Sequence, residues 1–147
     1  MFVVVTMAML LLAALPRFGR TLERLQTERI AFDTAQLLRY AQATAVMRRQ
    51  VIQCAFDEPT RRLRLGVKQQ DTVIPLQERF AASKPIPPTV RMSLHGNEPP
   101  EEELEFFPNG TSEGGTITVA REAQTVYTIT VDTATGRTSV LARPAPR

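Results

Sequence analysis

The first sixteen residues, MFVVVTMAMLLLAALP, constrain the fold of this chain more than any other segment. None of them is charged, and Thr6 is the one polar residue among them, so a helix made from them is apolar on every side. At about 1.5 Å per residue, Met1–Leu15 gives a helix of roughly 22 Å, which is shorter than the ~30 Å hydrocarbon core of a bilayer. A secretory signal would need a basic leader before the apolar run and a good small-residue cleavage site after it, and this run has neither. Its nearest arginines follow it, an arrangement that favours a cytoplasmic location for the rest of the chain.

An amphipathic helix is predicted directly after this run, from about Arg17 to Arg49. Pro16 lies at the junction, where it either kinks one continuous helix or begins a second one. Because no polar linker separates the two parts, we expect both to stay together in the mature protein. The arginine-rich face either points to solvent or pairs with acidic neighbours in an assembly. The apolar positions, at three- and four-residue steps with one seven-residue step, are Phe18, Leu22, Leu25, Phe32, Ala35, Leu38, Ala41 and Ala45.

The residues after the helix alternate with a period of two, which is typical of β-strands. Val51–Phe56 and Arg61–Val67 predict a hairpin around the turn Asp57–Thr60. Four prolines in Gln69–Pro88 predict turns or extended loop, because proline cannot donate to a strand ladder. Thr89–Leu94 predicts another strand, followed by an exposed acidic loop, HGNEPPEEE. In the second strand of the hairpin, the residues expected on the apolar face are Leu63, Leu65 and Val67.

The last third of the chain predicts an antiparallel meander. After the segment ELEFF and the turn PNGTSEGG come three β-branched segments, TITVA, TVYTITVD and RTSVLA, each bounded by turn-forming residues. The tail ARPAPR should fray. The inward-facing residues are expected to be Ile117 and Val119, with Tyr127, Ile129 and Val131 or their alternates across from them.

No set of residues predicts an enzyme or a cofactor site. The single cysteine, Cys54, excludes an internal disulfide, and its apolar setting in VIQCAF predicts a buried structural thiol. His95 is the only histidine and is expected in a polar loop, so neither a nucleophile–base pair nor a His-based metal site can form. The net charge of +3 is too small to indicate nucleic acid binding.

Three weaker motifs also have simpler explanations. Asn109-Gly110-Thr111 matches a glycosylation acceptor, but Asn-Gly between two strands is a typical turn. The glycine pair in SEGGT lacks the Lys-Ser/Thr of a phosphate-binding loop. Glu98 and Glu101–Glu103 lack the alternating spacing of a calcium loop, so a solvated acidic loop is expected.

The order of these elements resembles that of type IV pilins and of the pseudopilins of type II secretion. Within that superfamily, LLRYAQATAVMRRQVIQCAFD resembles the end of the long helix and the first strand of the GspH/FimT group. FFPNGTSEGGTITV and TITVDTATGRTSVL resemble the C-terminal signature of the same group. The resemblance implies an α+β pilin-like fold, in which the long N-terminal helix packs on a small antiparallel sheet.

The resemblance also implies the domain organisation and the assembly residues. Residues 1–16 would form the transmembrane and filament-core helix, 17–50 its amphipathic continuation, 51–142 the periplasmic β domain and 143–147 a flexible tail. The side chains implied in membrane insertion and assembly are Phe2, Val3, Val4, Val5, Met7, Met9, Leu10, Leu11, Leu12, Leu15 and Pro16.

The function implied is that of a minor pseudopilin, a non-enzymatic subunit of the periplasmic pseudopilus that helps export folded proteins across the outer membrane. The implied location is the bacterial inner membrane, crossed once, with the C-terminal domain in the periplasm. The implied partners are other major and minor pseudopilins, the inner-membrane assembly platform, the prepilin peptidase and secreted substrates. The alternatives are a minor type IV pilin acting in pilus assembly, adhesion or DNA uptake, and a membrane-anchored periplasmic domain that never polymerises.

One departure from the family pattern concerns the N-terminus. Members of the family begin with a short basic leader that the prepilin peptidase removes before Phe-Thr-Leu-x-Glu, and the peptidase site is therefore expected upstream of Met1. About five further residues would bring the apolar helix to roughly 20, enough to span a bilayer. N-terminal sequencing of the native protein tests this expectation.

Overall fold

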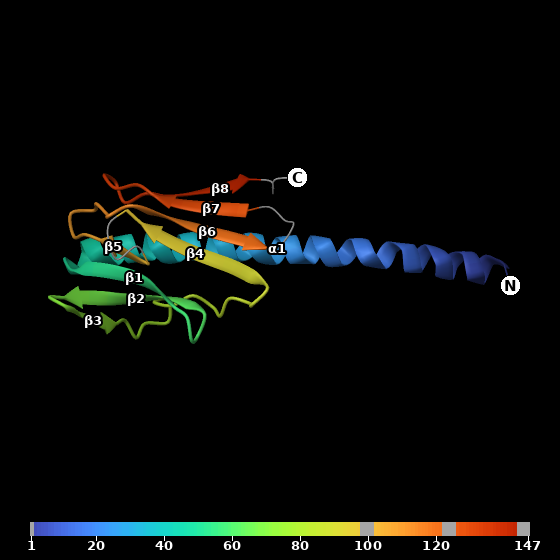
Figure 1. Cartoon of the computed structure of the whole chain (residues 1–147), viewed down its shortest axis with the longest axis horizontal. Helices are drawn as coiled ribbons and strands as arrows, with labels where there is room; N and C mark the ends of the chain where they lie inside the picture. Colours follow the sequence, from blue (N-terminus) through green and yellow to red (C-terminus); the bar gives the residue numbers. More distant parts are fainter. Residues whose placement is uncertain (1, 98–101, 122–125, 144–147) are drawn as a thin grey trace.

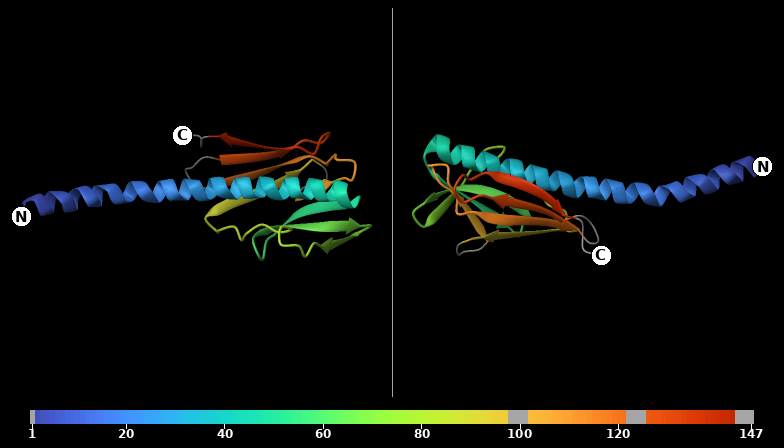
Figure 2. Two further views of the ribbon diagram at one scale, coloured as in Figure 1. Left: turned by 180° about the vertical axis from the view of Figure 1, so that it is seen from behind. Right: turned by 90° about the horizontal axis from the view of Figure 1, so that it is seen from above.

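A single helix, α1 (Phe2–Arg48), runs beside the whole β domain and continues well beyond it (Figure 1). The computed structural model describes residues 2–97, 102–121 and 126–143. With 47 residues, α1 is about 70 Å long. It passes through Pro16 without a break, so the apolar and amphipathic segments form one continuous helix. A proline inside a helix removes one backbone hydrogen bond, and α1 is bent in its blue, N-terminal part (Figure 2, right).

The helix ends where the backbone turns into the left-handed region. Arg49 has φ 52°, and the amide of Gln50 donates to the carbonyl of Ala45 at 3.2 Å. This hydrogen bond closes the last turn of the helix and sends the chain directly into the first strand. The predicted end at Arg49 is therefore confirmed to within one residue.

The first of two antiparallel sheets has the strand order β3-β2-β1-β5. The predicted hairpin is confirmed as β1 and β2, in a register that pairs Cys54 with Leu65. The expectation of turns or extended loop after Gln69 is wrong for one short stretch, because β3 forms a tight hairpin with β2 through a turn in which Gln70 has φ 54°. The strands are β1 (Val51–Asp57), β2 (Arg62–Gln69), β3 (Thr72–Pro75) and β5 (Glu103–Phe106).

The second sheet has the order β4-β6-β7-β8 and contains the predicted meander of β6, β7 and β8. His95 lies within β4, paired with Thr116, and not in a loop as expected from the sequence. Glu98 and Glu101 of the acidic loop, and the tail residues 144–147, lie outside the described residues. The strands are β4 (Val90–Gly96), β6 (Gly115–Arg121), β7 (Val126–Val131) and β8 (Thr138–Arg143).

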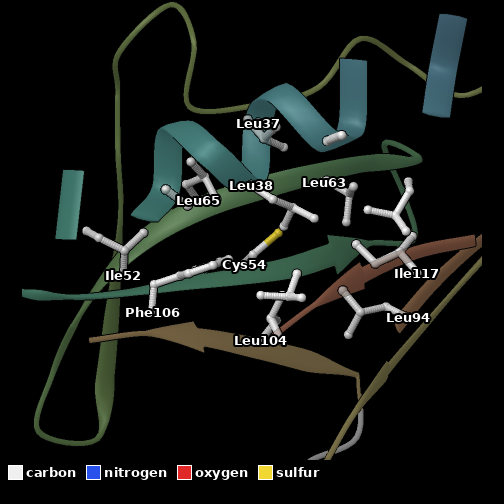
Figure 3. Packing of buried hydrophobic residues seen from close by; sticks show 14 of the residues in the cluster. Leu37, Leu38, Ile52, Cys54, Leu63, Leu65, Leu94, Leu104, Phe106 and Ile117 are labelled. Carbon is white, nitrogen blue, oxygen red and sulfur yellow. The ribbon is translucent and has the colours of Figure 1, made fainter. Parts of the chain in front are cut away.

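The core lies between α1 and the inner faces of both sheets (Figure 2, left). The helix contributes mainly small residues, which let its backbone approach the strands closely, together with Leu37 and Leu38. Cys54 lies in the middle of the cluster (Figure 3), as predicted. The predicted inward-facing residues of the hairpin and the meander are confirmed as buried: Leu63, Leu65, Val67, Ile117, Val119, Tyr127, Ile129 and Val131.

A polar contact fixes the helix against the turns of the second sheet. The side-chain amide of Gln42 donates to the carbonyls of Thr135, at 2.6 Å, and Gly110, at 3.3 Å. Gly136 has φ 61°, and a Cβ there would meet the Gly110 carbonyl at 2.7 Å and the Gln42 amide at 2.6 Å. Only glycine fits this backbone conformation and this close approach.

Candidate assembly surface of helix α1

The N-terminal half of α1 presents apolar side chains to every side. Val3, Val4, Val5, Met7 and Met9 are between 63% and 74% exposed. Because successive helix residues are rotated by about 100°, these five positions are spread around the whole circumference. The side chains of the other expected assembly residues, Phe2, Leu10, Leu11, Leu12, Leu15 and Pro16, lie outside the described part of the structure. Exposed apolar surface of this kind needs a partner that removes it from water.

Thr6 is compatible with these apolar surroundings because its hydroxyl group forms a hydrogen bond within the helix. Its Oγ1 donates to the carbonyl of Val3 at 3.0 Å, one turn back along the helix. A hydroxyl bonded in this way is far less costly to bury than a free one. Within the described residues, no helix is both long enough and apolar enough to cross a membrane.

Beyond the apolar run, α1 has a second exposed surface that points away from its own core. Leu22, Leu25 and Phe32 are 60%, 55% and 51% exposed. Their spacing of three and seven residues puts them on one side of the helix. The residues that do face the core are Thr27, Ala31, Thr34, Ala35, Leu37, Leu38, Ala41, Thr44 and Ala45. The apolar pattern found in the sequence therefore combines two faces, one buried in the domain and one free for other molecules.

The arginines of α1 divide between internal contacts and solvent. Arg48 forms an ion pair with Glu78, which also accepts a hydrogen bond from the Tyr40 hydroxyl. The Tyr40 hydrogen bond, followed by the attraction of Arg48, lowers the pKa of Glu78, and the same hydrogen bond raises the pKa of Tyr40. Arg39 donates to the carbonyl of Thr138 at 3.4 Å. Arg24 and Arg29 are exposed.

Cys54 and Asn109, two residues with a candidate chemical role in the described part of the chain, have structural explanations. Burial raises the pKa of the Cys54 thiol to about 12, which keeps it protonated and unreactive. Asn109 and Gly110 form the predicted turn, in which the Asn109 side-chain oxygen accepts from the amide of Thr111 at 3.1 Å. Among the residues that the structure describes, no three histidine, cysteine or acidic side chains are grouped so as to hold a metal ion.

Residues 31–135 match the protein family described as type II transport protein GspH. This chain belongs to the GspH family. It is thus a GspH-type minor pseudopilin of the type II secretion system, and the GspH family predicted from the sequence motifs is confirmed. GspH membership fits a β domain in the periplasm and association with other pseudopilins. No curated protein sequence matches the chain.

Solved structures support the pilin-like fold of this GspH protein. The minor pseudopilin EpsH of the type 2 secretion system of Vibrio cholerae has a TM-score of 0.65 and 18% identity, over 80% of this chain and 97% of EpsH. The type IV minor pilin FimU of Pseudomonas aeruginosa has a TM-score of 0.61 and 21% identity, over 83% of this chain and 91% of FimU. At such identities the likeness establishes the fold, and the predicted α+β pilin-like class is confirmed.

Proposed function

We propose that the apolar end of α1 holds this GspH protein in the bacterial inner membrane in a single pass, and then carries it into the pseudopilus. The observation that supports this proposal is the all-round exposure of apolar side chains on a helix end that projects free of the β domain (Figure 1). Among the side chains described, the first buried residue of α1 is Thr27, which lies about 37 Å along the helix from its start.

Assembly needs no chemistry from this chain under the proposal. In lipid, helices associate through close packing and not by leaving water, so an apolar helix can pass from the bilayer into a bundle of similar helices. A separate ATPase would supply the energy. The partners are then other major and minor pseudopilins and the inner-membrane assembly platform, with the prepilin peptidase acting earlier and secreted substrates later.

A gene deletion with complementation tests this role. The strain lacking the gene should accumulate folded secretion substrates in the periplasm, and the full chain should restore their release. In a Cys54-free background, a single cysteine at Leu25 should form crosslinks to other pseudopilins. A cysteine at the exposed Ser93 of β4 is the matched control and should not. Normal secretion by the deletion strain, or equal crosslinking at both positions, would contradict the proposal.

The likeness to FimU favours a minor type IV pilin as the second candidate. The same deletion strain separates the two functions, because loss of surface pili with normal secretion would identify a pilus subunit. Neighbouring genes for a secretin and other pseudopilins would favour the secretion role.

A further inference from the structure

A groove runs along α1 on the side of the first sheet. The loop between β3 and β4 runs on this side of the helix (Figure 2, left). Within this loop, the flanking segment, Glu78–Pro87, provides the second wall of the groove. Two hollows of about 290 and 520 Å³ lie between helix and segment, and both are lined by Asp33, Ser83 and Lys84. Together they follow α1 from Gln26 to Tyr40, which is about 21 Å and corresponds to roughly six residues of extended peptide.

The flanking segment is held firmly in place. Its amides and carbonyls bond to β2, with Ser83 N to Leu63 O at 2.9 Å and Leu65 N to Ala81 O at 2.8 Å. The guanidinium of Arg61 donates to the carbonyls of Ile86 and Pro87, at 3.1 and 3.4 Å, and to that of Val90 just beyond the segment, at 2.9 Å. At the other end, Glu78 is held by Tyr40 and Arg48. A groove that is already formed costs little ordering entropy when it binds a partner.

The groove has more positive than negative charge. Arg29, Arg79 and Lys84 line it against a single carboxylate, that of Asp33. Within the part of the chain that the structure describes, Arg29, Arg79 and Lys84 take part in none of the ion pairs found, which include Arg48–Glu78, Arg64–Asp57 and Lys68–Glu105. An acidic partner would find these charges available.

The groove also has an apolar component that suits a side chain of a partner. Phe80 is 69% exposed, although its ring packs against that of Tyr40 with centroids 6.3 Å apart. Leu37 and Ile86 line the two hollows as buried residues. An exposed phenylalanine over an apolar floor is a typical anchor point in protein–protein contacts.

We propose that this groove binds an extended acidic segment of a neighbouring pseudopilus subunit. The carboxylates of that segment face Arg29, Arg79 and Lys84, and one of its apolar side chains packs against Phe80. The identity of the partner as a pseudopilus subunit rests on the proposed function, whereas the acidic and extended character rests on the groove itself. The exposed Leu22, Leu25 and Phe32 of α1 form a different surface, which remains available for packing between helices.

Photo-crosslinking in cells tests the proposal on the full chain. A photoreactive phenylalanine analogue replaces the exposed Ala82, which lines the groove without taking part in the core. The crosslinked peptides, identified by mass spectrometry, should come from an Asp/Glu-rich segment of another pseudopilus subunit. The double charge reversal R79E/K84E should lower the crosslink yield about tenfold, because it turns attraction into repulsion. Reversing the acidic residues of the identified segment to lysine should restore it.

The matched control is R137E/R143E, which changes the net charge by the same amount at exposed positions before and at the end of β8. It should leave the crosslink unchanged. A crosslink to a phospholipid, to a neutral or basic segment, or to nothing at all would overturn the proposal, as would a yield unaffected by R79E/K84E. These outcomes leave crosslinking at Leu25 and the secretion phenotype untouched, so a failure of the groove is distinct from a failure of the proposed function.

Discussion

At the residue scale, Cys54 combines full burial with a strongly raised pKa. Its thiol is 0% exposed, and burial raises its pKa to about 12. Because the thiolate is the reactive form, a maleimide or disulfide reagent should modify Cys54 only as fast as the protein unfolds. A kinetic comparison of labelling in native buffer and in denaturant measures this, with the exposed Ala43→Cys in a Cys54-free chain as the fast control. Rapid native labelling of Cys54 would contradict the structure.

The same thiol makes stability depend on pH in the alkaline range. The folded pKa lies above the unfolded value of about 8.5, so the contribution of the neutral thiol is complete below that value. As the pH rises further, the unfolded chain loses the proton first and becomes favoured. Cys54→Ala should therefore flatten the alkaline decrease in the free energy of unfolding between about pH 8.5 and 11.

Asp132 provides the corresponding effect in acid. Its Oδ1 accepts from the hydroxyl and the amide of Thr135, both at 2.8 Å, and these hydrogen bonds lower its pKa. The stabilisation is present above the unfolded pKa of about 3.9 and is lost as the pH falls through the folded value. In thermal melts, Asp132→Asn should therefore have a lower Tm than the unsubstituted protein at pH 7. The difference in Tm should become smaller below pH ~4. Thr135→Val removes the hydroxyl donor and should weaken this pH dependence. A Tm difference between Asp132→Asn and the unsubstituted protein that does not change with pH would contradict the stabilising role of the Asp132 carboxylate.

At the scale of elements, the packing of α1 on two sheets depends on small side chains. Ala31, Ala35, Ala41 and Ala45 are all 0% exposed, so the helix backbone lies close to the strands. Ala41→Leu should destabilise the fold by about 1–3 kcal/mol, because the added atoms have no space. Ala43→Leu, two residues away on the exposed face, should change stability by less than about 0.5 kcal/mol. Denaturant unfolding measures the free energy of unfolding of both variants from the transition midpoint, provided that the slope is unchanged. Equal losses for Ala41→Leu and Ala43→Leu would mean that α1 is not packed as described.

At the scale of the whole molecule, the proposed function predicts that the two ends of α1 have separable roles. Val5→Lys places a charge in the exposed apolar end, which costs roughly 3 kcal/mol at the centre of a bilayer. We expect loss of incorporation into the pseudopilus and of secretion. The β domain should still fold, because the described core of the domain includes no residue before Thr27. Val5→Leu is the apolar control. Pulldown of pseudopilins, a secretion assay and circular dichroism measure the outcomes, and normal secretion by Val5→Lys would contradict the assembly role.

Local patterns in the sequence determined much of this fold. The change from a helical period to a period of two located the end of α1 and the β1–β2 hairpin, because side-chain spacing follows backbone geometry directly. The Asn-Gly turn and the inward-facing residues of β6 and β7 followed for the same reason. The apolar run was visible as a segment that needs a partner outside the domain, since no single domain face can bury a helix that is apolar on every side.

Only the tertiary structure decided the contacts between segments that are distant in the sequence. The segment ELEFF precedes the meander in the chain, yet as β5 it pairs with β1 and closes the first sheet. Leu22 and Leu38 look alike in the helical pattern, but only Leu38 lies over the β domain. The loop after β3 and helix α1 are far apart in the sequence, yet they share one groove, which Arg29 of the helix and Lys84 of the loop both line. Periodicity reports which residues share a face of one element, whereas the choice of what covers that face depends on packing across the whole chain.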